Sequence, residues 1–168
     1  MTPSYSLLSE EHFQAIKDRY PNTKPIFLMR DPVDRYWSAM RMGARDDGSA
    51  SALSLVESNL ENPQHLLRGR YDLTVQALDA VFGEDAYLAI FSEELYQQSS
   101  INRICKYLGI MEREADFQKR ENASPENETL DVEARKRIFD AFSPVYRFFD
   151  SRGVILPAKW RQSMEQYG

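Results

Sequence analysis

The sequence has little cysteine, histidine or glycine, and this limits the chemistry it can carry. Cys105 is the one cysteine among 168 residues, so neither an internal disulfide nor a cysteine-based metal site can form. We expect Cys105 to be a small core residue on the apolar face of a helix. His12 and His65 are far apart in the sequence, without the spacing of metal ligands. The sequence therefore predicts no metal site.

Long apolar runs and excess positive charge are also missing. No stretch approaches the roughly 20 consecutive apolar residues that a transmembrane helix needs, and no secretory signal pattern opens the chain. We therefore expect a cytoplasmic protein without a membrane-spanning segment. The formal net charge of −5 argues against broad nucleic-acid binding. The composition, 42% hydrophobic and 28% charged, predicts a single globular domain over residues 1–168.

The most informative stretch of the chain is a short apolar run followed by an amphipathic helix. Residues 25–29 predict a strand buried on both faces, as in a parallel sheet. Asp31 is placed to cap a helix, and Pro32 fits its first position. One face of this helix has the i, i+3, i+4, i+7 spacing of buried residues, at Val33, Tyr36, Trp37 and Met40. The opposite face is expected to be polar, with Asp34, Arg35, Ser38, Arg41 and Arg45.

The rest of the chain predicts an α/β fold with few parallel strands and many helices. A second buried strand is expected at residues 86–91, and Ser92 with its acidic neighbours is expected to cap a helix after it. Apolar periodicity and terminator residues predict the helices, over residues 9–20, 51–60, 65–82, 100–108, 131–142 and 143–153.

Residues 30–41, RDPVDRYWSAMR, resemble the 3′-phosphate-binding element of sulfotransferases that use 3′-phosphoadenosine 5′-phosphosulfate (PAPS). That element is an apolar strand, an Arg-Asp/Asn-Pro segment, and a Ser about eight positions after the first Arg. The resemblance places Arg30 and Ser38 on the phosphate, with Arg35 in support. A guanidinium offers paired charged donors to phosphate oxygens, and a hydroxyl adds one more. The alternative is that the arginines only pair with nearby aspartates on a solvated face.

Two further segments are similar to the family. Residues 68–71, Arg-Gly-Arg-Tyr, are similar to a Gly-x-Tyr segment that precedes the corresponding helix in several sulfotransferases. Its arginines either face an anionic substrate or nucleotide, or are simply exposed. The family often places a basic loop against the nucleotide near the end of the domain, and Lys119 and Arg120 are the local candidates. A solvated loop is the alternative there.

The resemblance covers residues 2–153 and lacks one family element. Sulfotransferases hold the 5′-phosphosulfate in a loop of Pro-Lys-x-Gly-Thr-Thr type, and none of the seven glycines follows a Lys in a strand-to-helix turn. We therefore expect a truncated, P-loop-NTPase-like sulfotransferase domain. The chain is then a fragment, a shortened relative, or one part of a site that another polypeptide completes. The catalytic residues are left unassigned.

The resemblance implies a sulfotransferase-like function with the 3′-phosphate site present. Its cosubstrate is PAPS, its product adenosine 3′,5′-bisphosphate (PAP), and its acceptor a hydroxyl or amine of unknown identity. The alternative is a non-catalytic relative that binds such a nucleotide or has only a structural or interaction role. A sheet that lacks an interior strand exposes unpaired backbone, so we expect either rearranged packing, with the helices closing over the gap, or a homodimer through the exposed sheet edge.

Overall fold

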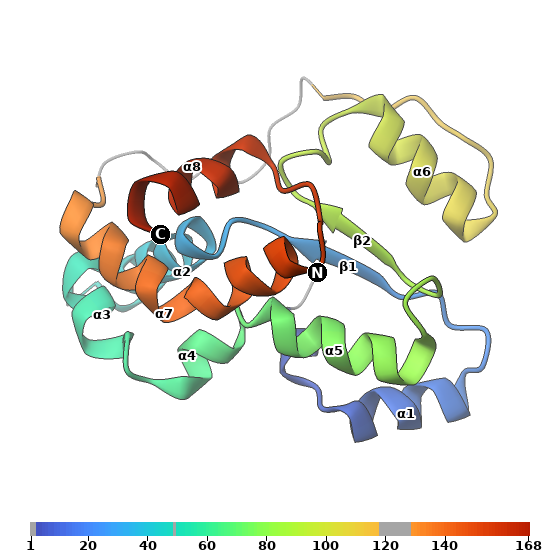
Figure 1. Ribbon diagram of the computed structural model, residues 1–168, viewed down its shortest axis with the longest axis horizontal. Coiled ribbons are helices and arrows are strands. Elements are labelled where there is room, and N and C mark those ends of the chain that lie inside the picture. The colour runs from blue at the N-terminus through green and yellow to red at the C-terminus, as the bar shows by residue number, and fades with distance from the viewer. Residues whose placement is uncertain (1–2, 49, 118–128) are drawn as a thin grey trace. The chain divides into compact units, whose positions relative to one another are not determined.

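The structure is a computed structural model that describes residues 3–48, 50–117 and 129–168 (Figure 1). Its elements follow in chain order: η1 (Pro3–Leu7), α1 (Glu10–Arg19), β1 (Ile26–Met29), α2 (Pro32–Asp47), α3 (Ala52–Asn59), α4 (Pro63–Leu67), α5 (Tyr71–Phe82), β2 (Leu88–Phe91), α6 (Gln98–Leu108), α7 (Val132–Ser151) and α8 (Ala158–Tyr167).

The chain forms two compact units, each built from segments that are distant in the sequence. Unit 1 comprises Met1–Leu8, Asp31–Val75 and Glu128–Gly168, and unit 2 comprises Ser9–Arg30 and Gln76–Asn127. The single domain expected over residues 1–168 stays a prediction.

Unit 2 contains a parallel pair of strands. β1 pairs with β2 in the register Ile26 to Leu88 through Met29 to Phe91. This confirms the α/β prediction of few parallel strands among many helices, although both strands start later than expected. Pro25 has no N–H to donate, and its carbonyl accepts the Leu88 amide at 3.0 Å. The amide of Ala86 bonds back to Gly83 in a turn, so β2 begins only after it.

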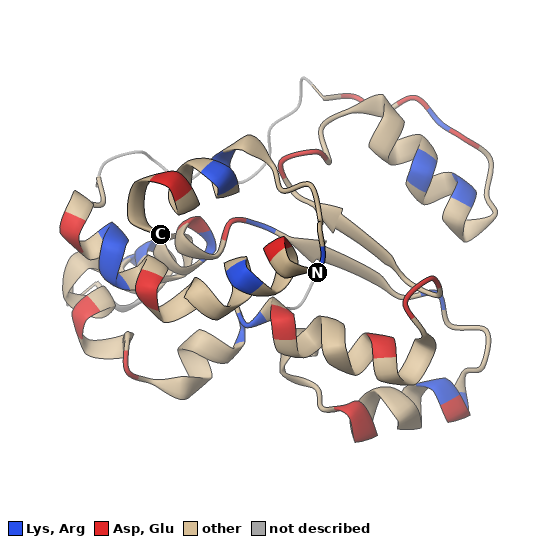
Figure 2. Cartoon of the chain, in the orientation of Figure 1, with Lys and Arg blue, Asp and Glu red and all other residues tan. Residues whose placement is uncertain are grey.

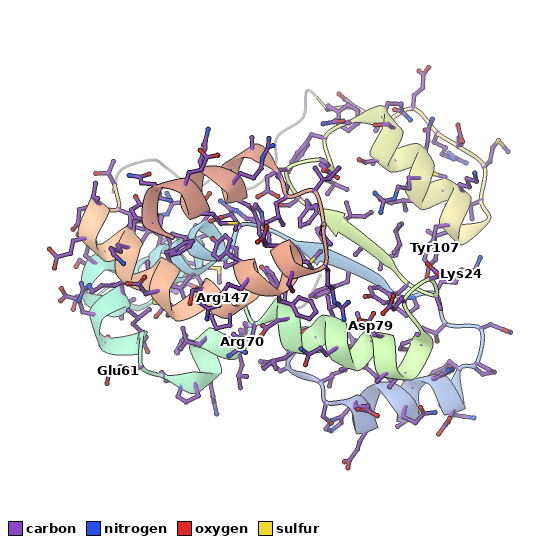
Figure 3. The ribbon with its side chains drawn as sticks, viewed as in Figure 1. Lys24, Glu61, Arg70, Asp79, Tyr107 and Arg147 are labelled. Atoms are coloured by element: carbon purple, nitrogen blue, oxygen red, sulfur yellow. The ribbon has the colours of Figure 1, made fainter. Side chains whose placement is uncertain are left out.

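Polar side chains fix the surroundings of this sheet within unit 2. Arg103 of α6 donates to the backbone carbonyl of Ala89 in β2 at 2.8 Å. Lys24 donates to the last carbonyls of α6, at 2.9 Å for Tyr107 (Figure 3). A lysine at a helix C-terminus satisfies carbonyls that lack intrahelical partners. These contacts connect α6 to β2 and to the segment that precedes β1.

The outer edge of β1 bears on the expected dimer. Leu88 and Ser92 donate their amides to Pro25 and Met29 of the β1 segment. Alternate residues of a parallel strand face the same neighbour, so Ile26 and Leu28 direct their backbone groups to the other edge. The homodimer through that edge stays a prediction.

Unit 1 is helical and has an aromatic core. Within it α2 packs against α3 and α7, and α7 packs against α8. The ring of Tyr36 lies edge-on to Phe142, with 5.8 Å between centroids, and Trp160 contacts Tyr146 in the same manner at 5.6 Å. The predicted buried face of α2 is confirmed, because Val33, Tyr36, Trp37 and Met40 are all buried.

Three predicted helix boundaries are wrong. Residues 65–82 do not form one helix: α4 ends at Leu67, and i to i−3 bonds at residues 69 and 70 turn the chain into α5. Ser92 caps no helix, because residues 92–96 form turns and α6 begins at Gln98. The expected break at residue 143 is also absent, since Pro144 lies inside α7. Proline removes one backbone donor there, and the buried residues on both sides keep the helix packed.

Candidate functional site

The start of α2 is anchored by a buried carboxylate. Asp31 is the N-cap and accepts the Asp34 amide at 3.0 Å, as the sequence predicts. Its second oxygen accepts the Tyr146 hydroxyl of α7 at 2.8 Å, and the Ser163 hydroxyl of α8 lies 3.4 Å away. The residue is 0% exposed. The cap therefore fixes α2 against two helices that are distant in the sequence.

A second carboxylate, one turn along the helix, also connects α2 to α7 and α8. Asp34 pairs with Arg135 of α7 at 3.2 Å and with Lys159 of α8. Burial raises the pKa of Asp34, but the hydrogen bonds and charges of Lys159 and Arg135 outweigh this and hold it below its usual value. Asp34 belongs to the polar face predicted from the sequence, yet the structure buries it, since it is 6% exposed. Figure 2 shows that α7 and α8 each carry both acidic and basic residues.

Two predicted phosphate ligands lie together on α2. Arg35 and Ser38 are one turn apart, a spacing that makes side chains neighbours on a helix surface, and both are half-buried. Arg35 forms no ion pair within the described part of the chain, so the alternative that it pairs with an aspartate is not what the structure shows. Burial lowers the pKa of Arg35, nearby Tyr71 opposes this, and the positive charge of Arg68 lowers it further.

The two arginines of residues 68–71 have different environments. Arg70 is committed to Asp72, with contacts of 2.8 Å from Nε and 2.6 Å from Nη2 (Figure 3). Arg68 is half-buried, and its Nε is buried without a hydrogen-bond partner among the described residues. Between them, Gly69 is packed so closely that an added Cβ would lie 2.7 Å from the Phe142 ring. The two arginines therefore differ: Arg70 pairs with a carboxylate two residues along the chain, whereas Arg68 has no such partner among the described residues.

The other predicted site residues are placed differently. Arg30 is exposed and is the last residue of the first segment of unit 2, directly before the N-cap of α2 in unit 1. Its participation in the site stays a prediction. Lys119 and Arg120 lie outside the described residues. Cys105 is buried and free, as expected.

Two kinds of feature are absent from the parts of the chain that the structure describes. No group of three or more His, Cys, Asp or Glu residues there could hold a metal ion. None of the helices described is both long enough and apolar enough to span a bilayer.

The arrangement favours an anionic ligand on the flank of α2. Both aspartates near the helix start are engaged by side chains of α7 and α8: Asp31 accepts hydrogen bonds from hydroxyl groups, and the charge of Asp34 is compensated by Arg135 and Lys159. Arg35, Ser38 and Arg68 together offer several donors and no competing carboxylate partner among the described residues. Guanidinium and hydroxyl groups are suited to phosphate or sulfate oxygens.

Comparisons with known proteins agree with this reading of the fold. A model described as "Sulfotransferase family" matches residues 4–114, more than half of the chain. The crystal structure of a sulfotransferase from Alicyclobacillus acidocaldarius is similar, with a TM-score of 0.69 at 23% sequence identity. The similarity covers 94% of this chain and 65% of that one, so the chain spans less than two thirds of its length. A comparison with curated proteins gave no significant match.

Proposed function

Since the chain belongs to the sulfotransferase family, we propose that it binds PAPS or PAP and takes part in sulfuryl transfer to a hydroxyl or amine acceptor. In this proposal Arg30 and Ser38 bind the 3′-phosphate, and Arg35 supports them. The family match spans all three residues.

The observation that carries the proposal is that the acidic and basic residues of α2 have different partners. Its aspartates hold the helix to unit 1, whereas Arg35 and Ser38 have no bond to a protein side chain among the described residues. Ser38 lies six residues beyond Pro32, about 9 Å along the helix at 1.5 Å per residue. A phosphate held by Ser38 therefore lies along the helix flank and not at its N-terminus. A rigid helix with unsatisfied donors on that flank is pre-organised for such a ligand.

Binding at the 3′-phosphate would assist the chemistry indirectly. In the transfer, a bond forms from the acceptor oxygen or nitrogen to sulfur while the bond from sulfur to the phosphate oxygen breaks. The electron pair and negative charge pass to the leaving PAP, and the acceptor loses a proton to a base that we leave unassigned. Contacts to the remote 3′-phosphate contribute by fixing the position of the reacting group.

The alternative is a module that binds a 3′-phosphoadenosine nucleotide without transferring sulfate. It is favoured by the sequence, whose seven glycines include none in a Pro-Lys-x-Gly-Thr-Thr segment. The two functions differ in one measurement, the release of PAP from PAPS in the presence of hydroxyl and amine acceptors. Acceptor-dependent release supports the enzyme, and nucleotide binding without release supports the module.

Calorimetric titration tests the proposal directly. PAP is titrated into the native chain, into Arg30→Ala and into Arg45→Ala, with adenosine 5′-monophosphate (AMP) as the ligand that lacks the 3′-phosphate. Arg45 is the control because it is an exposed arginine on the same helix, paired with its neighbour Asp46. We expect PAP to bind more tightly than AMP, and only Arg30→Ala to remove this preference. Equal affinity for the two nucleotides in the native chain would refute the proposal.

A further inference from the structure

Arg35 and Arg68 are like charges that lie within electrostatic range of each other in unit 1. Neither forms an ion pair with a carboxylate among the described residues, whereas other arginines of unit 1 do. Those pairs join Arg45 to Asp46, Arg70 to Asp72, Arg135 to Asp34 and Arg137 to Glu57. Two half-buried like charges within electrostatic range, without a carboxylate partner among the described residues, cost free energy, which a bound anion would recover.

Arg68 also has one hydrogen-bond donor that lies out of reach of water and has no protein partner among the described residues. Its Nε is buried and makes no hydrogen bond within the described residues. Buried polar groups in native proteins are nearly always paired, so an orphaned donor calls for a partner. An anion in contact with this guanidinium would supply one.

The backbone beside Arg68 is held in place by the core. Phe142 touches Gly69 so closely that no Cβ fits, and the same ring packs edge-on against Tyr36 of α2. Tyr36 directly follows Arg35 in the helix. One aromatic contact therefore joins the turn that carries Arg68 to the part of α2 that carries Arg35 and Ser38.

From this geometry we propose that Arg68 binds the 3′-phosphate of the nucleotide, together with Arg35 and Ser38. This assignment rests on the proposed function and adds a residue to its site. Arg70, although only two positions away, is excluded by its bidentate contact with Asp72. Arg35 of α2 and Arg68, which follows α4, then contribute guanidinium groups from two elements of unit 1, in addition to the Arg30 of the proposed function.

Two guanidinium groups suit a doubly charged phosphate monoester. Each arginine donates in a planar fork that matches phosphate oxygens, and Ser38 contributes a further hydroxyl donor. A ligand without the 3′-phosphate leaves both charges uncompensated. Arg68 should accordingly contribute to the discrimination between PAP and AMP and leave the affinity for AMP unchanged.

The test measures the affinities of PAP and AMP for the native chain, Arg68→Gln, Arg68→Lys and Arg45→Gln by calorimetry. We expect Arg68→Gln to weaken PAP binding at least tenfold without changing AMP binding. Arg68→Lys keeps the positive charge but loses the planar pair of guanidinium donors. Its affinity for PAP should therefore lie between those of the native chain and Arg68→Gln. Arg45→Gln removes an arginine from α2 outside the cluster and should bind PAP as the native chain does. Thermal melts of each variant show that it is folded.

Each other outcome overturns a distinct part of the proposal. Native preference for PAP that persists in Arg68→Gln refutes the role of Arg68 and leaves the proposed function standing. An equal loss for PAP and AMP places Arg68 at another part of the nucleotide, such as the 5′-phosphate. Should the native chain not distinguish PAP from AMP, the proposed function fails and the assignment of Arg68 fails with it.

Discussion

Replacing Asp31 with alanine tests whether a single buried carboxylate fixes the candidate site. The change removes the side-chain cap of α2 and the acceptor of the Tyr146 hydroxyl, which lies 2.8 Å from the carboxylate. Loss of an N-cap costs about 1 kcal/mol, and a hydroxyl left buried without a partner costs about 1–3 kcal/mol. We therefore expect Asp31→Ala to lower the free energy of unfolding by about 2–4 kcal/mol.

A double-mutant cycle with Tyr146→Phe separates these two contributions. Tyr146→Phe alone removes a hydrogen bond to a carboxylate and should cost about 1.5–3 kcal/mol. In the double variant the hydroxyl no longer exists, so nothing is left orphaned when the carboxylate is removed. The combined cost should fall short of the sum of the single costs by about 1–2 kcal/mol.

Urea unfolding followed by tryptophan fluorescence is the appropriate assay. Trp37 and Trp160 are the two tryptophans of the chain, and both are buried in unit 1, so the signal reports on this unit. Ser163→Ala is the comparison variant, because its hydroxyl also contacts Tyr146 and lies 3.4 Å from the Asp31 carboxylate, farther than the Tyr146 hydroxyl. It should cost less than Tyr146→Phe. Strictly additive costs for Asp31→Ala and Tyr146→Phe would refute the coupling of the cap to α7.

Three other predictions concern unit 1. Burial raises the pKa of Tyr36 to about 12, so unfolding should become easier as the pH rises above the ordinary tyrosine pKa of 10.0; Tyr36→Phe should flatten this decline in alkaline urea titrations, and an unchanged slope would contradict it. The pKa of Asp34 is held below 3.8, so the ionised carboxylate stabilises the folded protein above that pH, and this stabilisation is lost as the pH falls through the lower folded value. In acid titrations the free energy of unfolding of Asp34→Asn should therefore depend less on pH than that of the native chain. Gly69→Ala should lower stability by about 1–3 kcal/mol through overpacking against Phe142, and its cost in thermal melts should be smaller in a Phe142→Leu background. An equal cost of Gly69→Ala with Phe and with Leu at residue 142 would argue against this contact.

Local rules predict the elements that carry the site. The strand before residue 30, the cap at Asp31, the proline at the first helical position and the buried face of α2 all follow from nearest-neighbour chemistry. These signals need only the residues within two helical turns. That range is also enough to place Arg35 and Ser38 on one flank of the helix.

Helix continuity could not be predicted in the same way. Pro144 is a strong local stop signal, yet α7 runs through it because Phe142, Val145 and Tyr146 are buried around it. Conversely, the apolar spacing over residues 65–82 fits one long helix, whereas Gly69 turns the chain where it meets Phe142. In both places the packing of distant segments outweighs local propensity.

The same reasoning explains why the sequence could not show which polar residues of α2 are paired by the protein and which are not. Asp34, Arg35 and Ser38 are equally polar and nearly adjacent, and amphipathic periodicity assigns all of them to solvent. What distinguishes them is the charge of the partners: Asp34 meets cations from α7 and α8, whereas the charge near Arg35 is that of Arg68. In the proposed function the positive charge of Arg35 is therefore available to a ligand. The motif indicates which residues would bind a phosphate, but it does not describe the packing of α2 that pairs Asp34 and leaves Arg35 unpaired among the described residues.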